Sequence, residues 1–255
     1  MLRASKAAAE ITLPLFRSSL KVENKYEVGF DPVTKADREA EQSIREIISL
    51  AFPDHSIVGE ELSDKITNSP YEWVIDPIDG TRAYISGLPV WGTLIGLKEN
   101  GKAIAGLMSQ PYIGETYIAV NGGVELIYQK NISKLKVRNT QDLSKAIMFT
   151  TTPKLFSTNE HVKAFEAVEE KVLLSRYGVD CYAYSLLAAG QIDLIIEPDL
   201  KPCDVAPLIA IVENAGGVIS TWNGERAENG GNIIASATVE LFEAAQKIMN
   251  NSNYG

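Results

Sequence analysis

The sequence has little cysteine and histidine and no long apolar segment. Its two cysteines, Cys181 and Cys203, are too few for a disulfide framework, so we expect a reducing cytoplasm and two buried, free thiols. The two histidines, His55 and His161, are too scattered for a zinc site, and we interpret them as structural or surface residues. No apolar run approaches the ~20 residues that span a bilayer, and the N-terminal segment lacks the apolar core of a signal peptide. We therefore expect no membrane partner and no export.

Basic residues are outnumbered as well. Lysine and arginine total 24, aspartate and glutamate total 33, and the formal net charge is −9. Because such a surface repels phosphate backbones, we expect no nucleic-acid partner. An anionic substrate would need a local reversal of sign from an arginine, a helix N-terminus or a bound cation. The length of 255 residues and the apolar share of 45% are ordinary for a globular chain of one large or two modest domains.

Hydrophobic periodicity divides the chain into two halves without a polar linker. Residues 1–137 are predicted to pack helices against an antiparallel sheet, and residues 138–255 to alternate strands and helices in layers. In the first half we expect helices to about Leu20 (with a kink at Pro14) and over Ala36–Ala51, and strands over Ser56–Val58, Glu72–Ile75, Val90–Leu97, Ala103–Ser109, Thr116–Val120 and Glu125–Tyr128. In the second half we expect strands over Ala146–Thr150, Val172–Ser175, Ile192–Ile196, Gly217–Thr221 and Asn232–Ser236, and helices over Asn159–Glu169, Tyr182–Ala189, Val205–Ala215 and Val239–Met249. The halves should share a cleft.

The most informative segment runs from Trp73 to Arg82. An apolar strand ends at Asp76, Pro77 fixes the backbone, and Asp79-Gly80-Thr81 turns toward the next element. Two carboxylates three residues apart on such a turn can converge on one point. Gly80 permits close approach of a ligand, and Thr81 can begin a short helix whose N–H groups face an anion. The segment taken alone also fits a plain Asp-Gly turn with Asp76 as a helix N-cap.

Further acids follow the same pattern elsewhere in the chain. Glu60 ends another predicted strand in Gly59-Glu60-Glu61, Asp204 stands at a helix start, and Asp37 opens the second predicted helix. Asp37 and Asp204 could act only as capping residues. A cluster of Glu60, Asp76, Asp79 and Asp204, however, would repel itself without cations. Hard divalent ions with oxygen ligands, above all Mg²⁺, are the natural counter-charge.

These segments resemble the three signatures of the inositol monophosphatase superfamily. The segments that carry the resemblance are Gly59-Glu60-Glu61, Trp73 to Thr81, and Asp204-Val205-Ala206 to Ala215-Gly216-Gly217. Within the superfamily the chain is most similar to bacterial histidinol-phosphate phosphatases, on the segments Phe30 to Asp37, Leu88 to Leu97 and Arg176 to Tyr184. The resemblance implies α+β and α/β halves in a layered αβαβα sandwich of the sugar-phosphatase type. It also implies a phosphomonoesterase and a homodimer.

The resemblance also implies roles for particular residues. One Mg²⁺ would be held by Glu60, Asp76 and the carbonyl of Ile78, and a second by Asp76, Asp79 and Asp204, with Asp37 in a secondary shell. A third, weaker ion would rest on Glu60. The phosphate of a small monoester would meet Asp79 and the N–H groups of Gly80 and Thr81. Metal-activated water would attack phosphorus, oriented by the catalytic residues Glu60 and Thr81.

Specificity is assigned to residues further along the chain. Glu197 and Asp180 match substrate contacts of the family, and two acids suit the cationic amine and imidazole of histidinol phosphate. Glu197 also fits a sugar-alcohol hydroxyl, and Asp180 fits a plain N-cap equally well. Arg82 either faces the phosphate or forms a structural ion pair. The aromatic residues Trp91, Tyr182 and Tyr184 are interpreted as core rather than site.

Three other functions are alternatives to histidinol phosphatase. Inositol-1-monophosphatase is the alternative within the same enzyme class. A protein-binding regulator is a second alternative, because some relatives in the superfamily regulate transcription or RNA processing, although intact metal residues favour an enzyme. A phosphatase of the haloacid dehalogenase type needs two aspartates two residues apart, whereas Asp76 and Asp79 are three apart.

Overall fold

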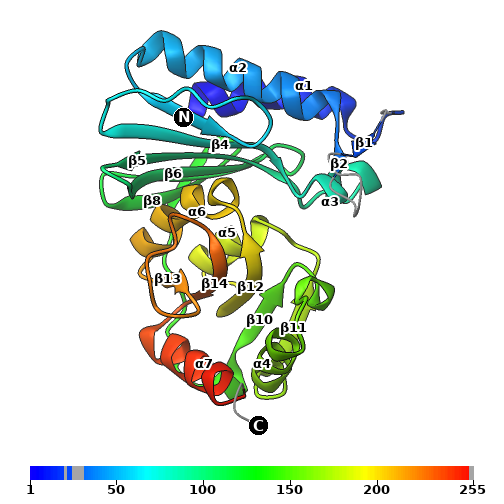
Figure 1. Ribbon diagram of the computed structural model, residues 1–255, viewed down its shortest axis with the longest axis vertical. Coiled ribbons are helices and arrows are strands. Elements are labelled where there is room, and N and C mark those ends of the chain that lie inside the picture. The colour runs from blue at the N-terminus through cyan, green and yellow to red at the C-terminus, as the bar shows by residue number, and fades with distance from the viewer. Residues whose placement is uncertain (20–21, 25–31, 253–255) are drawn as a thin grey trace.

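The computed structural model describes residues 1–19, 22–24 and 32–252. It contains two main β-sheets and three layers of helices, in the order helices, sheet, helices, sheet, helices (Figure 1). This arrangement is the αβαβα sandwich expected from the sequence. Residues Phe30 and Asp31, which belong to one of the similar segments, lie outside the described residues. Within the part of the chain that the structure describes, no helix is long and apolar enough to cross a membrane.

The larger sheet has seven strands in sequence order and belongs entirely to the first half. Its strands are β3 (Ser56–Gly59), β4 (Tyr71–Asp79), β5 (Gly92–Glu99), β6 (Lys102–Gln110), β7 (Glu115–Val120), β8 (Gly123–Tyr128) and β9 (Asn131–Lys134). The expectation of an antiparallel sheet is wrong for β3 and β4, which pair in parallel, and correct for the other pairs. β9 was not anticipated, because its four residues are all exposed and carry no apolar alternation. The Asn100-Gly101 turn forms the expected hairpin, with positive φ at both residues.

Two helices cover the outer face of this sheet (Figure 1). They are α1 (Leu2–Leu15) and α2 (Lys35–Ala51), and a short pair of strands, β1 (Glu23–Asn24) and β2 (Pro32–Val33), lies between them in the chain. Ala8, Ala40 and Ile44 pack there against Trp73 and Ile75 of the sheet. α1 ends at Leu15 rather than near Leu20, because Phe16 leaves the helix in an extended conformation and packs on Tyr84 and Trp91.

The smaller sheet belongs to the second half and has the strand order β11-β10-β12-β14-β13. The strands are β10 (Ile147–Thr150), β11 (Leu174–Tyr177), β12 (Leu194–Leu200), β13 (Val218–Thr221) and β14 (Gly231–Ser236). β10 pairs in parallel with β11 and β12, whereas β14 runs antiparallel to β12 and β13. The remaining helical segments are α3 (Thr81–Ser86), α4 (Asn159–Glu169), α5 (Tyr182–Ala188), α6 (Pro202–Asn214), α7 (Val239–Ser252), η1 (Leu143–Lys145) and η2 (Pro153–Leu155).

Helices α5 and α6 lie between the two sheets and join the halves through one core (Figure 1). Leu208 and Ile209 of α6 share a buried cluster with Leu94 and Met108 of the larger sheet and with Ile195 of the smaller one. α6 begins at Pro202, three residues before the expected start, because proline is well suited to the first helical turn. The expected boundary at residues 137/138 falls between the two sheets, and the division into halves stays a prediction.

The contact between α6 and β6 predicts a position that will not tolerate a side chain. A Cβ on Gly106 would stand 1.8 Å from the carbonyl oxygen of Pro207. We expect Gly106→Ala to lower the free energy of unfolding by about 1–3 kcal/mol, because a close-packed interface must shift to admit the methyl group. Urea denaturation will measure this. Gly123→Ala is the control, since its Cβ would meet only one atom at 3.8 Å, and an equal loss there would contradict the steric explanation.

Candidate active site

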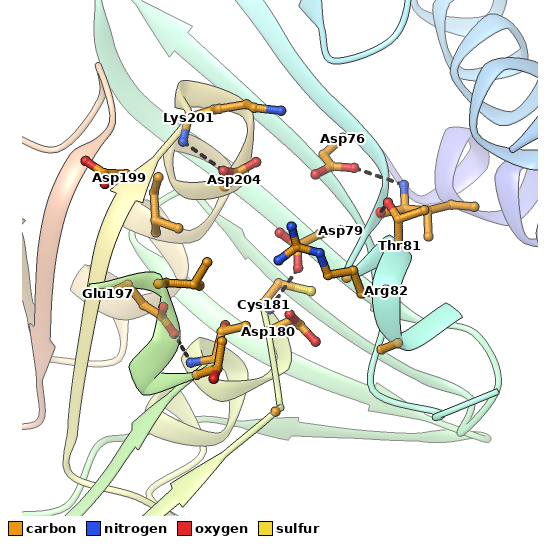
Figure 2. Close-up of a pocket in the computed structure, with 18 of the residues that line it drawn as sticks. Asp76, Asp79, Thr81, Arg82, Asp180, Cys181, Glu197, Asp199, Lys201 and Asp204 are labelled. Carbon is orange, nitrogen blue, oxygen red and sulfur yellow. Dashed lines mark hydrogen bonds between the residues drawn. The ribbon is translucent and has the colours of Figure 1, made fainter. Parts of the chain in front are cut away.

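A cavity of about 670 Å³ between the halves is lined by four of the predicted carboxylates, Glu60, Asp76, Asp79 and Asp204. Figure 2 shows the three aspartates around it. Both halves line this cavity, as expected for a shared cleft. Ligand atoms of Asp76, Asp79 and Asp204 lie within 4.8 Å of one another, and so do those of Glu60, Asp76 and Cys203. Asp76 belongs to both groups. Four carboxylates and one thiol, from three separate chain segments, therefore offer two adjoining positions for a metal ion.

The end of β4 positions two of these acids. The pairing of β4 with β5 is irregular between Asp76 and Asp79, where Asp76 lies opposite Leu94 and Asp79 opposite Gly92. Asp76 Oδ1 accepts the N–H of Ile78 at 2.9 Å, which turns the carboxylate back over the strand end. Asp79 Oδ1 accepts the N–H of Cys181 at 2.9 Å and so contacts the second half. Asp76 is not a helix N-cap, because α3 begins five residues later with Gly80 as its N-cap.

The third and fourth acids come from α6 and from the residue after β3. Asp204 is the third residue of α6, where its Oδ2 accepts the N–H of Lys201 at 2.8 Å and its Oδ1 accepts the Cys203 thiol at 3.4 Å. It is therefore a capping residue that also faces the cavity. Glu60 follows β3, its N–H donates to the carbonyl of Ile75, and its Oε1 accepts Lys201 Nζ at 3.0 Å. Lys201 thus links the two halves across the acidic cluster.

Burial and mutual repulsion dominate the electrostatics of the cluster. Burial, followed by the charge of Glu60 and the other carboxylates, raises the pKa of Asp76 well above its ordinary value. Burial and the charge of Asp204 do the same to the pKa of Asp79, and burial raises the pKa of Asp204. Burial and repulsion together therefore disfavour the ionised form of the cluster when no cation is bound. The carboxylate oxygens of the two adjoining groups fit hard divalent cations, and the Cys203 thiol is the one softer donor among them.

Asp37 lies outside both donor groups among the described residues. It caps α2, because its Oδ2 accepts the N–H and the hydroxyl of Thr34 at 2.8 and 2.6 Å. Its Oδ1 is buried without a hydrogen-bond partner. Burial raises the pKa of Asp37 to about 6, and the charge of Glu60 adds to the shift. Its capping role is confirmed, and its place in a secondary metal shell stays a prediction.

The turn after β4 brings the other predicted groups together. The hydroxyl of Thr81 donates to the carbonyl of Ile78 at 3.1 Å, so the predicted metal-binding carbonyl and the predicted catalytic hydroxyl contact each other. Gly80 has φ of 81°, and a Cβ there would lie 3.2 Å from the side chain of Asp180. Only glycine suits both constraints. Arg82 on α3 is exposed and points into the cavity (Figure 2).

Two further acids, Glu197 and Asp180, line the same cavity outside both donor groups, and we call this part of its wall the recess. Glu197 is buried on β12, its Oε1 accepts the N–H of Thr151 at 2.6 Å, and its Oε2 has no hydrogen-bond partner. Burial raises the pKa of Glu197 to about 8. Burial also raises the pKa of Asp180 to about 6, against the opposing charge of Arg82. Asp180 is not the N-cap of α5, which is Cys181, and its own φ of 47° is unusual for a residue other than glycine.

Sequence reasoning missed three features of this cavity. Cys203 is buried and free as expected, and it also supplies the third atom of one donor group. Tyr184 is only 2% exposed, as expected of core, yet it lines the cavity and its hydroxyl has no hydrogen-bond partner. Lys201 forms an ion pair with Glu60, 141 residues away in the chain. Lys201 and Cys203 both precede Asp204 within three residues, and this proximity was the one available signal.

The layered fold and its acidic cavity define the protein as an α+β sandwich with a candidate site for divalent cations. Residues 2–253 match the inositol monophosphatase family, and the chain belongs to this family.

Named relatives and a solved structure support the same class. The chain is 43% identical to "Bifunctional phosphatase IMPL2, chloroplastic" of Arabidopsis thaliana over 86% of its own length, and it spans 62% of that protein, less than two thirds. It is 35% identical to a histidinol-phosphatase of Streptomyces coelicolor, covering 90% of this chain and 88% of that protein. The structure of an inositol monophosphatase from Zymomonas mobilis has a TM-score of 0.86 and 36% identity, covering 98% and 95% of the two chains. These names agree on a phosphatase and differ in substrate.

Proposed function

We propose that this protein is a Mg²⁺-dependent phosphomonoesterase that converts L-histidinol phosphate to L-histidinol. The observation that carries the proposal is the juxtaposition of two donor groups sharing Asp76 with an acidic recess in the same cavity. The donor groups suit a phosphate bound through cations, and the recess suits an organic part that carries positive charge. The similarity to a histidinol-phosphatase over 90% of the chain supports this substrate class.

The proposed roles of the site residues follow from their positions. Glu60 and Asp76, with the Ile78 carbonyl, would hold one Mg²⁺, and Asp76, Asp79 and Asp204 a second. Bound Mg²⁺ supplies positive charge that polarises the phosphoryl group and makes a water molecule more acidic. Glu60 accepts a proton from the attacking water, and the Thr81 hydroxyl, 3.1 Å from the Ile78 carbonyl, orients that water.

Different parts of the cavity lining bind the phosphate and the organic part of the substrate. The N–H groups at Gly80 and Thr81 and the guanidinium of Arg82 face the phosphate oxygens, where opposite charge and backbone donors stabilise the anion. Asp180 and Glu197 bind the ammonium and imidazole groups of histidinol. Glu197 Oε2, buried and without a partner, is a suitable acceptor for a charged N–H. A cation in the recess also favours the ionised form of both carboxyl groups, offsetting the effect of burial.

Phosphate release tests this assignment. Purified protein is incubated with L-histidinol phosphate or with myo-inositol 1-phosphate, each with Mg²⁺ or with a chelator. We expect hydrolysis only with Mg²⁺ and a higher kcat/KM for histidinol phosphate, because inositol offers hydroxyls but no positive charge to the recess. A clear preference for inositol phosphate would replace the substrate and leave the phosphatase class intact.

Variants of the recess give the sharper form of this test. We expect Asp180→Asn and Glu197→Gln each to lower kcat/KM for histidinol phosphate by about 10- to 100-fold, since a charge-assisted hydrogen bond contributes about 1.5–3 kcal/mol. The effect on inositol phosphate should be much smaller. Asp199 is an exposed acid that lines the same cavity, so Asp199→Asn is the matched control. This variant should leave kcat/KM for both substrates close to the wild-type values. Equal losses on both substrates would contradict the charge-recognition role.

The expected homodimer and cytoplasmic location stay predictions.

A further inference from the structure

One buried carboxylate on α2 accepts hydrogen bonds from the segment that carries Glu60. Glu41 lies on the inner face of α2 and is fully buried. Its Oε2 accepts the N–H of Glu61 at 2.7 Å, and its Oε1 accepts the N–H of Leu62 at 3.3 Å. These are the two residues that follow Glu60. A side chain of the first helix pair therefore fixes the backbone directly after a candidate metal ligand.

Arg45, one turn further along α2, completes the arrangement. Its Nε donates to Glu41 Oε1 at 2.7 Å, and its Nη2 donates to the carbonyl of Leu62 at 3.1 Å. A weaker contact of 3.5 Å joins its Nη1 to the carbonyl of Ile57 in β3. The guanidinium thus bridges the strand before Glu60 and the loop after it, because its planar fork can reach several acceptors at once.

Gly59 is the feature that makes this approach sterically possible. A Cβ at this position would stand 2.0 Å from Glu41 Oε1 and 2.8 Å from Arg45 Nη2. The glycine directly before Glu60 therefore admits the ion pair to the backbone, and any side chain would expel it. On the opposite side, the N–H of Glu60 donates to the carbonyl of Ile75, next to Asp76.

Stability alone is a weak explanation for a buried ion pair. Desolvating two charges costs free energy that their attraction often fails to recover, and well-packed apolar residues can replace such pairs without loss. An apolar contact between α2 and this loop would also leave the N–H groups of Glu61 and Leu62 without their present acceptors. The ion pair instead fixes the orientation of Glu60, because its hydrogen bonds hold the backbone before and after that residue.

We propose that Glu41 and Arg45 are positioning residues that hold Glu60 at its distance from Asp76 and thereby set the affinity of the protein for a divalent cation. This inference rests on the proposed function only in taking Glu60 as a metal ligand. Neither residue is among those that line the cavity. Groups that orient metal ligands commonly change metal affinity by about 10- to 100-fold when they are altered.

Metal binding measured without turnover tests the proposal. Mn²⁺ stands in for Mg²⁺ because both prefer oxygen ligands, and its free concentration is read by electron paramagnetic resonance in a titration of the protein. We expect Glu41→Gln to raise the dissociation constant for one bound Mn²⁺ by about 10- to 100-fold. We also expect faster hydrogen exchange at the amides of Glu61 and Leu62 in the metal-free protein. Where Glu41→Gln does not fold, Arg45→Lys, which keeps the charge and loses the fork, should shift both readouts in the same direction by less.

Asp193→Asn is the matched control. Asp193 is another fully buried carboxylate in an ion pair, with Arg138, and its Oδ2 also accepts a backbone N–H, from Ile147. We expect this variant to lose thermal stability and to keep the wild-type affinity for Mn²⁺. If Glu41→Gln loses stability while its Mn²⁺ affinity stays at the wild-type value, the pair is only structural and the inference is overturned. If wild-type protein binds no Mn²⁺ at all, the metal-dependent function fails as well, so the two failures are distinguishable.

Discussion

Asp79→Asn is expected to lower kcat/KM for phosphate-ester hydrolysis by about 10³-fold, with every substrate that the wild-type protein accepts. The ligand atom of Asp79 lies within 4.8 Å of those of Asp76 and Asp204, so the substitution removes one of three charges from that group. A metal ion in such a site supplies several kcal/mol of transition-state stabilisation, and each 1.36 kcal/mol corresponds to a factor of ten. Steady-state phosphate release at saturating Mg²⁺ measures the loss.

The same variant should gain stability in the absence of metal. Burial and the charge of Asp204 raise the pKa of Asp79, so ionised Asp79 destabilises the folded state, and asparagine removes that charge. Denaturation in the presence of a chelator at neutral pH should therefore show a higher midpoint for Asp79→Asn than for the wild-type protein. Asp142→Asn, an exposed acid that caps η1, should leave activity unchanged and serves as the control. Activity within tenfold of wild type in Asp79→Asn would exclude Asp79 from the metal site.

The acidic cluster could be predicted because each acid carries a local signal. Asp76 and Asp79 stand at the end of an apolar strand, Asp79 borders a glycine, and Asp204 lies in the first turn of an apolar helix. Their meeting point, in contrast, depends on tertiary pairing. β4 extends to Asp79 rather than ending at Ile75, since the irregular pairing with β5 allows the strand to continue through Pro77. From the sequence alone, a proline predicts the end of a strand, because it cannot donate a hydrogen bond to the neighbouring strand.

The groups that modify the cluster could not be predicted, because their partners are distant in the sequence. Glu41 lies 20 residues from Glu61, and in the sequence it cannot be distinguished from the other polar residues of α2. Its burial follows from the packing of α2 on the larger sheet, and only Gly59 permits the contact. Lys201 and Glu60 likewise meet through the docking of the two halves. Local pattern therefore identifies residues with a chemical role, whereas long-range packing determines which residues orient them.

Saturating Mg²⁺ is expected to raise the thermal midpoint of unfolding by about 5–10 °C near pH 8. A ligand at 100 times its dissociation constant stabilises the folded state by about 2.7 kcal/mol, and each kcal/mol shifts the midpoint of a protein of about this size by about 2–4 °C. The increase should be much smaller near pH 5. Asp76 and Asp79 have raised pKa values from burial and repulsion, so protons compete with the metal there. Scanning calorimetry with Mg²⁺ or chelator at both pH values measures the difference.

The metal-free protein should show the opposite dependence on pH. The folded state raises the pKa of Asp37 and Asp180 to about 6 and that of Glu197 to about 8, so it binds protons more tightly than the unfolded chain does. Their contribution to stability is complete below the unfolded values near pH 4 and is lost as the pH rises through about 6 to about 8. Carboxylates elsewhere with lowered pKa values act the other way, but they contribute equally with and without Mg²⁺. The difference between the two curves therefore isolates the cavity, and an Mg²⁺ effect equal at pH 5 and pH 8 would mean that the ion binds outside this cluster.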